Sequence, residues 1–161
     1  MTQENKHIFV FGIFAVDISF YVDKKVKPGE TIIAKSSNIG PGGKASNQAI
    51  SARKLGATTT LITRLGDDNF NSYANDIWKK EKLFTSVKID KNLPTGKAGI
   101  FIDDKTGENS VIVDPGASAH LCIDDFYSQK SKMKKGDIFL TQFEQSSDTT
   151  FAVLREASEL G

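Results

Sequence analysis

Residues 40–49 read Gly-Pro-Gly-Gly-Lys-Ala-Ser-Asn-Gln-Ala, and the interpretation of the whole chain depends on this stretch. Glycines that precede a helix let the backbone approach a ligand closely, and the first turn of the helix offers free N–H groups. Asn47 is a poor helix former, and the amide groups of Asn47 and Gln48 need polar partners. The stretch therefore indicates either a plain glycine turn with surface amides or a site for a ligand with several hydroxyl groups.

Two nucleotide-binding signatures can be tested against the same stretch. The phosphate-loop pattern Gly-x4-Gly-Lys-Ser/Thr fails at its first glycine and at its hydroxyl position. The dinucleotide pattern Gly-x-Gly-x-x-Gly/Ala is met by Gly40, Gly42 and Ala45, and Arg64 or Asp67 would then read the ribose. That pattern should directly follow the first strand of a sheet, which it does not do here. A dinucleotide-dependent oxidoreductase fragment is therefore the weaker alternative.

Upstream of the glycines, the sequence predicts strands of two kinds. Residues 8–13 form a continuous apolar run, which is typical of a strand buried on both faces. Residues 16–23 alternate between apolar and polar, which indicates a strand with one solvated face. A turn at 27–30 and a further strand at 31–36 would complete a small exposed sheet beside the core sheet.

Downstream of the glycines, helical and strand patterns alternate. Ala45, Ala49, Ala52 and Leu55 recur at helical spacing, and such a stripe of mostly small residues lets a helix lie close to a sheet. Further strands are predicted at 58–65, 98–103, 110–114 and 138–143, and further helices from Asp67 or Asp68 through Trp78 and from about Asp148. This alternation predicts the α/β class.

The composition of the 161-residue chain excludes several classes of protein. With 39% hydrophobic and 25% charged residues it is an ordinary globular chain, and its net charge of +1 gives no field to attract nucleic acid or an anionic membrane. The single Cys122 cannot form an intrachain disulfide, which favours a reducing compartment, so we expect a cytoplasmic protein. His7 and His120 lie too far apart to suggest a metal site, and no apolar run approaches the ~18 residues of a membrane helix.

The glycine-rich stretch also carries a family signature. A glycine pair, a small residue, an asparagine and two later glycines stand at the family's spacing, at Gly42, Gly43, Ala45, Asn47, Gly56 and Gly66. Supporting matches follow in the right order: Gly12 with Asp17 beyond it, Pro28-Gly29-Glu30, Gly66-Asp67-Asp68, Thr95-Gly96, Gly107-Glu108-Asn109, Gly116-Ala117 and Gln142-Phe143-Glu144. Over nearly its whole length the chain resembles the N-terminal half of a ribokinase-like carbohydrate kinase.

The resemblance implies a doubly wound α/β fold with a mainly parallel sheet and a small β lid, truncated at its C-terminal side. Lid strands would lie near residues 16–37 and 98–114. Residues 1–161 would form the N-terminal part of a single sugar-kinase domain, without the C-terminal nucleotide-binding half. The implied activity is phosphorylation of a sugar's primary hydroxyl, with ATP and Mg²⁺ as cofactors, and the lid would offer a homodimer interface.

The resemblance also implies which residues bind the sugar. The Asp17 carboxylate, on a lid strand, would accept hydrogen bonds from sugar hydroxyls. Gly43 and Lys44 would meet the sugar by backbone and side chain, and Asn47 would bind hydroxyls through its amide. Glu144, at the carboxyl end of a strand, would hold a further hydroxyl.

Two departures from the family pattern limit these implications. Ala15 stands where family members usually carry an asparagine, which removes one amide contact and leaves the identity of the sugar open. The family's catalytic base and anion hole lie in a Gly-Ala-Gly-Asp segment that this sequence lacks, so we expect the chain alone to be inactive. A non-catalytic sugar-binding or interaction fragment is the main alternative function.

Overall fold

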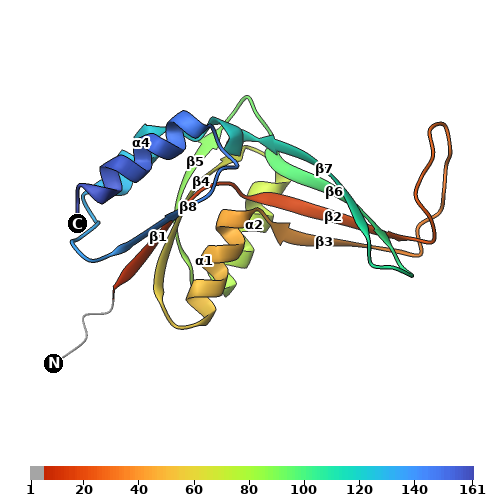
Figure 1. The fold of residues 1–161 in the computed structure, drawn as a ribbon, viewed down its shortest axis with the longest axis horizontal. Coiled ribbons are helices and arrows are strands. Elements are labelled where there is room, and N and C mark those ends of the chain that lie inside the picture. Colours follow the sequence, from red (N-terminus) through yellow and green to blue (C-terminus); the bar gives the residue numbers. More distant parts are fainter. Residues whose placement is uncertain (1–5) are drawn as a thin grey trace.

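A computed structural model describes residues 6–161, which form a body of sheet and helices and a second sheet that projects from it (Figure 1). The strands are β1 (His7–Phe11), β2 (Ala15–Val22), β3 (Ser36–Gly42), β4 (Thr58–Gly66), β5 (Phe84–Asp90), β6 (Thr95–Asp103), β7 (Asn109–Gly116) and β8 (Ile138–Thr141). The helices are α1 (Lys44–Lys54), α2 (Asn69–Lys80), α3 (Ile123–Lys130) and α4 (Ser147–Ser158), with a short 3-10 helix η1 (Ala117–His120).

The sheet of the body is fully parallel, with the strand order β5-β4-β1-β8. Helices α1 and α2 cover one face of this sheet, and helices α3 and α4 cover the other. Alternate residues of β1 point to opposite faces, so β1 contributes side chains to both sides of the core. Val10 packs with the α1 and α2 side, whereas Phe9 and Phe11 pack with the α3 and α4 side. This arrangement confirms the predicted doubly wound α/β class.

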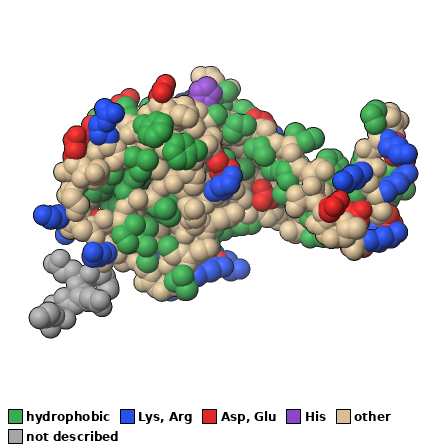
Figure 2. Space-filling view, in the orientation of Figure 1, with side chains coloured by type: hydrophobic (Ala, Val, Ile, Leu, Met, Phe, Trp, Pro, Cys, Tyr) green, Lys and Arg blue, Asp and Glu red, His purple; other side chains and the backbone are tan. Residues whose placement is uncertain are grey.

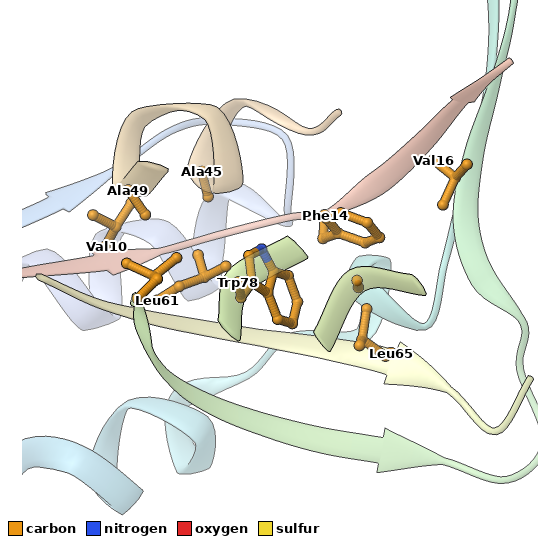
Figure 3. Packing of buried hydrophobic residues seen from close by; sticks show 10 residues of the cluster. Val10, Phe14, Val16, Ala45, Ala49, Leu61, Leu65 and Trp78 are labelled. Carbon is orange, nitrogen blue, oxygen red and sulfur yellow. The ribbon is translucent and has the colours of Figure 1, made fainter. Parts of the chain in front are cut away.

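Small residues let α1 lie close to the sheet. Ala45 and Ala49 are fully buried against Val10 and Leu61 (Figure 3). The Trp78 indole from α2 fills the neighbouring space, and its Nε1–H donates to Ser46 Oγ at 3.1 Å. The buried tryptophan therefore has its hydrogen-bond partner, and the α1 side of the core leaves no unsatisfied indole.

The second sheet, which we call the lid, has the strand order β3-β2-β6-β7. Strand β2 is antiparallel to β3 and parallel to β6, and β6 is antiparallel to β7. The chain crosses between body and lid at four connections, β1 to β2, β3 to α1, β5 to β6 and β7 to η1. All four lie at the same end of the lid, so its other end projects freely from the body (Figure 1).

The segment from β4 to α2 confirms the sequence prediction. The strand predicted at 58–65 is β4, and of the two candidate caps it is Asp68 that begins α2. The Asp68 carboxylate accepts hydrogen bonds from the N–H groups of Phe70 and Asn71. It also accepts from the backbone N–H and the hydroxyl of Thr95, both at 2.8 Å, and so it connects α2 with the start of β6.

The strand predicted at residues 31–36 is wrong. Strand β3, the antiparallel partner of β2, begins only at Ser36 and runs through the Gly-Pro-Gly sequence of residues 40–42. Glycine and proline are poor strand formers, but as the outermost strand of the lid β3 tolerates them. Residues 23–35 instead form a loop at the projecting end of the lid, and this loop contains the predicted turn at 27–30.

Other differences concern bounds and exposure. Strand β5 was not predicted, because it is an edge strand in which no residue is fully buried and whose first residue, Phe84, is 60% exposed. Strand β8 ends at Thr141, short of the predicted 143, and Ile138 at its start is 48% exposed. Leu55 does not extend the buried stripe of α1, because the helix has ended there and the side chain is 89% exposed. Within residues 6–161, no helix is both long and apolar enough to cross a membrane.

Candidate functional site

Asp17 lies on β2 close to the body, and its carboxylate packs directly over Gly42 at the end of β3. A Cβ atom at position 42 would come within 2.2 Å of Asp17 Oδ1, which no real contact allows. Any side chain at position 42 would therefore displace this carboxylate. Position 42 of the signature therefore requires glycine because the Asp17 carboxylate lies against it, and not because the backbone turns there.

The Asp17 carboxylate has no protein partner among the residues that the structure describes. Partial burial raises the pKa of Asp17 above its ordinary value, and neither a cation nor a hydrogen-bond donor from residues 6–161 offsets that effect. An ionised carboxylate only accepts hydrogen bonds, and it can accept several. Asp17 is thus an acceptor that a ligand with donor groups could satisfy.

Gly43 begins α1 at a point where two backbone segments touch. Its φ of +83° is unfavourable for other residues, and a Cβ there would lie 2.5 Å from the carbonyl oxygen of Ile13 and 2.7 Å from Phe14 Cα. As the N-cap residue it offers no side chain to cap the helix. The free N–H groups of the first turn therefore depend on other acceptors.

Glu144 provides one such acceptor. The backbone N–H of Lys44 donates to Glu144 Oε2 at 3.2 Å, and Lys44 Nζ forms an ion pair with Glu144 Oε1. A carboxylate at a helix N-terminus is favoured by the helix dipole. Glu144 follows β8 at the carboxyl edge of the sheet, so this ion pair joins the end of β8 to the start of α1.

The two amides predicted to need polar partners differ in the structure. Asn47 is exposed, and its side chain forms no hydrogen bond within residues 6–161, although its backbone N–H donates to the carbonyl of Gly43 at 3.0 Å. Gln48 is partly buried, and its Oε1 accepts from the side-chain amide of Gln142. Asn47 is therefore free to meet a ligand, whereas Gln48 belongs to an internal contact.

The structure thus gathers the predicted site residues around the N-terminus of α1. Gly43, Lys44 and Asn47 lie within its first turns, Glu144 contacts Lys44, and the Asp17 carboxylate lies over the glycine before Gly43. They come from the lid, from α1 and from the end of β8. Three distant parts of the chain meet at one place.

Sequence reasoning missed an apolar row on the same face of the lid as Asp17. In the strand register Asp17 is opposite Ala98 of β6, which is opposite Val113 of β7. Two residues further along, Ile100 and Val111 share that face, and both valines are about half exposed. The continuous apolar run of residues 111–113 was the signal that could have identified these valines. A ligand beside Asp17 would meet a carboxylate and an apolar surface together.

Two other features do not contribute to this cluster. A cavity of about 250 Å³ at the projecting end of the lid contains none of the predicted site residues, and its lining includes Val22, Val26 and Phe101. Arg64, a candidate ribose reader for the dinucleotide alternative, is buried and donates from Nε to Asp125 Oδ2 at 2.8 Å. Its guanidinium is therefore already engaged inside the body.

Comparison with known proteins places the chain in a family. Residues 5–159 match the pfkB family carbohydrate kinases. A ribokinase of Dictyostelium discoideum is 36% identical over 154 residues, covering 95% of this chain and 48% of that protein. A deoxyribokinase of Salmonella typhi is 30% identical over 157 residues, covering 96% of this chain and 50% of that protein. The solved structure of a ribokinase from Giardia lamblia aligns with a TM-score of 0.88 at 25% identity, covering 96% of this chain and 50% of that chain.

The chain therefore spans about half the length of these relatives, and the match extends over nearly all of its own residues. The α/β body, the second sheet and the glycine signature agree with that match. The chain belongs to the pfkB family of carbohydrate kinases.

Proposed function

We propose that residues 1–161 form the N-terminal part of a sugar-kinase domain and provide its sugar-binding half. In this proposal Asp17 binds the sugar from the lid, and Gly43, Lys44, Asn47 and Glu144 bind it from the body. The observation that carries the proposal is the partly buried Asp17 carboxylate, which has no protein partner in the described chain and lies directly over Gly42.

A sugar would satisfy this carboxylate. Removing a carboxylate from water without a partner is costly, and hydrogen bonds to charged groups are worth about 1.5–3 kcal/mol. Two neighbouring sugar hydroxyls can donate to the two carboxylate oxygens. The apolar row of Ala98, Ile100, Val111 and Val113 would contact the C–H groups of the ring, so the lid face suits a molecule that is polar at its edge and apolar on its face.

The body would contact the sugar through the first turns of α1. The Lys44–Glu144 pair is partly exposed, and each of its groups retains hydrogen-bonding capacity for a hydroxyl. Asn47 can both donate and accept through its amide. A sugar hydroxyl that approaches α1 would therefore find donors and acceptors of both kinds.

The phosphoryl donor is a separate question. Kinases of this family use ATP, generally with Mg²⁺, and phosphoryl transfer depends on groups that stabilise the transferred phosphoryl. Within residues 6–161 no three side chains of His, Cys, Asp or Glu gather in a way that could hold a metal ion. We derive no step of the transfer from the described residues. We propose that the 161-residue chain binds sugar without phosphorylating it.

A pentose is the substrate class that we propose. The relatives are named ribokinase and deoxyribokinase, so both ribose and deoxyribose should be tried. Ala15 lies in β2 two residues before Asp17, where an asparagine would add one polar contact. Without that asparagine amide the chain would make one contact fewer to the sugar, and so we expect it to discriminate less between related pentoses.

The test is an NMR titration of the chain with each pentose, which detects weak binding through backbone amide shifts. We expect the amides of Gly42, Gly43 and Lys44 to move in the parent protein and to stay still in Asp17→Ala. Asp114→Ala is the matched control, because Asp114 is another lid carboxylate but pairs with Lys97 at 3.2 Å. Equal binding by Asp17→Ala and the parent would remove the basis of the proposal, and sugar-dependent ADP release would show that the chain is catalytic.

A further inference from the structure

We infer that Gln142 and Gln145, two buried glutamines on either side of Glu144, are positioning residues that hold its carboxylate at the N-terminus of α1. The capping of α1 by Glu144 is a feature of the structure itself. Its importance for a sugar rests on the proposed function. Neither glutamine forms a hydrogen bond with Lys44, so both would act through the backbone that carries Glu144.

The segment that follows β8 is arranged unusually for a surface loop. Gln142 and Gln145 are only 9% and 6% exposed, whereas the aromatic Phe143 between them is 65% exposed. Burying a polar side chain is unfavourable unless its hydrogen bonds are replaced. Two buried glutamines beside an exposed phenylalanine are therefore expected only where contacts within the protein replace the hydrogen bonds that the glutamines would make to water.

Gln142 connects the end of β8 to α1. Its Nε2–H donates to Gln48 Oε1, one helical turn beyond the residue that Glu144 caps. Its Oε1 lies against Gly12, where a Cβ would be 2.3 Å from that oxygen and 2.8 Å from Ala45 Cβ. Because Gly12, directly after β1, has no side chain, the side-chain amide of Gln142 can occupy the space beside it.

The hydrogen bonding of Gln142 argues against a purely stabilising role. Its Oε1 is buried and has no hydrogen-bond partner in the part of the chain that the structure describes. An unsatisfied buried acceptor costs about 1–3 kcal/mol, and an apolar side chain of similar length would avoid that cost. What an apolar residue could not supply is the directional bond to Gln48.

Gln145 fixes the other end of the segment. Its side-chain Nε2 lies 2.9 Å from Thr141 Oγ1, 2.8 Å from Thr150 Oγ1 and 2.5 Å from the backbone oxygen of Gln142. These contacts fold residues 141–145 back onto the first turn of α4. Glu144 is therefore held between an amide bonded to α1 and an amide bonded to the end of β8 and to α4.

The experiment compares the backbone amide resonance of Lys44 between variants by NMR at one neutral pH. In the parent chain this resonance should show the downfield shift of an N–H that donates to a charged acceptor, because the Glu144 carboxylate accepts the Lys44 N–H. Glu144→Gln should lose most of this downfield shift, because an amide oxygen is a weaker acceptor than a carboxylate, and so identify its source. Gln142→Met and Gln145→Met should each lose most of the shift, although neither replaces a group that contacts Lys44.

Gln129→Met is the matched control. Gln129 is also a buried glutamine, 8% exposed, but it lies on α3 and bonds to Ser86 Oγ at 2.9 Å. It should retain the full shift. If either glutamine substitution folds poorly, Gln48→Leu removes the partner of Gln142 from a partly exposed position and should reduce the shift in the same way.

The full downfield shift of the Lys44 amide in folded Gln142→Met, Gln145→Met or Gln48→Leu would overturn the inference for the corresponding contact. A loss of shift in Gln129→Met as well would also overturn it, because the effect would then follow from general destabilisation. The measurement contains no sugar, so its outcome is independent of the titration that tests Asp17.

Discussion

The body and the lid each contain a four-stranded sheet, but they are stabilised in different ways. Both faces of the body sheet are covered by helices, and large side chains such as Trp78 and Phe126 are fully buried there. The lid carries exposed apolar residues on both faces, including Ile39, Ile112 and Val113. Hydrophobic burial therefore stabilises the body far more than the lid, whose faces stay available for a ligand or a partner.

Charges show the same contrast. At the projecting end of the lid, Lys35 Nζ lies 2.8 Å from Asp23 and 2.7 Å from Asp104, and basic and acidic side chains gather there in Figure 2. These groups are exposed, so each pair contributes little to stability. In the body, the Arg64–Asp125 pair is almost fully buried. The lid should therefore tolerate substitutions of charged residues that the body does not.

The largest expected effect comes from breaking the buried pair. Arg64→Met leaves Asp125 charged, buried and unpaired, which should lower the free energy of unfolding by about 3–5 kcal/mol. Lys97→Met breaks the exposed Lys97–Asp114 pair of the lid and should cost less than about 1 kcal/mol. Urea denaturation of both variants measures the difference, and equal costs would contradict the contrast between body and lid.

Asp68, which connects α2 to the lid strand β6, should give the next largest effect. Asp68→Ala removes a helix cap and two bonds to Thr95, so we expect a loss of about 2 kcal/mol at neutral pH. Asp67→Ala is the control, since the neighbouring Asp67 is exposed and does not cap the helix. A similar loss in Asp67→Ala would show that the negative charge matters and not the geometry.

The contribution of Asp68 should also depend on pH. Partial burial acts to raise the pKa of Asp68, but the hydrogen bonds from Thr95, Asn71 and Phe70 outweigh it and hold the pKa below the ordinary 3.8. The folded state therefore binds this proton less readily than the unfolded chain, and stability falls as the pH drops below about 3.8. Asp68→Ala should show a shallower loss over that range in urea denaturation, and an unchanged slope would contradict the assignment.

Asp17 should behave in the opposite way. Burial raises its pKa, so the folded state binds this proton more readily than the unfolded chain, and the charged form costs stability at neutral pH. Asp17→Asn should therefore raise the Tm slightly at neutral pH while it weakens the pentose-induced amide shifts. A lower Tm in Asp17→Asn would contradict this expectation, because it would show that the carboxylate is stabilised by a partner in the folded chain.

We propose that the chain forms a homodimer through the lid, and a substitution on the lid can test this without a change in stability. Ile112→Lys places a charge on a residue that is 69% exposed in the lid, and we expect it to weaken a homodimer while altering the free energy of unfolding by less than about 0.5 kcal/mol. Ile138→Lys, on the outer strand of the body, should leave the dimer intact. Sedimentation equilibrium decides between the two surfaces, and a loss of association in Ile138→Lys alone would place the contact on β8 instead.

Local signals predicted the body better than the lid. Strand β4 and the Asp68 cap are encoded by adjacent residues, and the structure confirms both. Strand β3 was misplaced because its bounds depend on pairing with β2, which can recruit even a Gly-Pro-Gly sequence. The edge strand β5 has only exposed and partly exposed residues, so its sequence shows no clear pattern.

The candidate site shows the same limit. The resemblance indicated Asp17, Lys44 and Glu144 one by one, and the structure brings them together. The bond between Lys44 and Glu144 joins residues 100 positions apart, and no periodicity in the sequence could reveal it. The contact between Gln142 and Gln48 was hidden for the same reason, since it depends on the absence of a side chain at Gly12.

Because all four connections lie at one end of the lid, any rigid tilt of the lid would turn about that end, next to the body. Displacement in a tilting plate grows with distance from the pivot, and a strand rises ~3.3 Å per residue. Asp17 is two residues from the start of β2 and Val22 is seven, so a tilt about that start would move Val22 roughly three and a half times as far as Asp17. The carboxylate can therefore keep its alignment with α1 and Glu144 while the outer end of the lid swings through a wide arc.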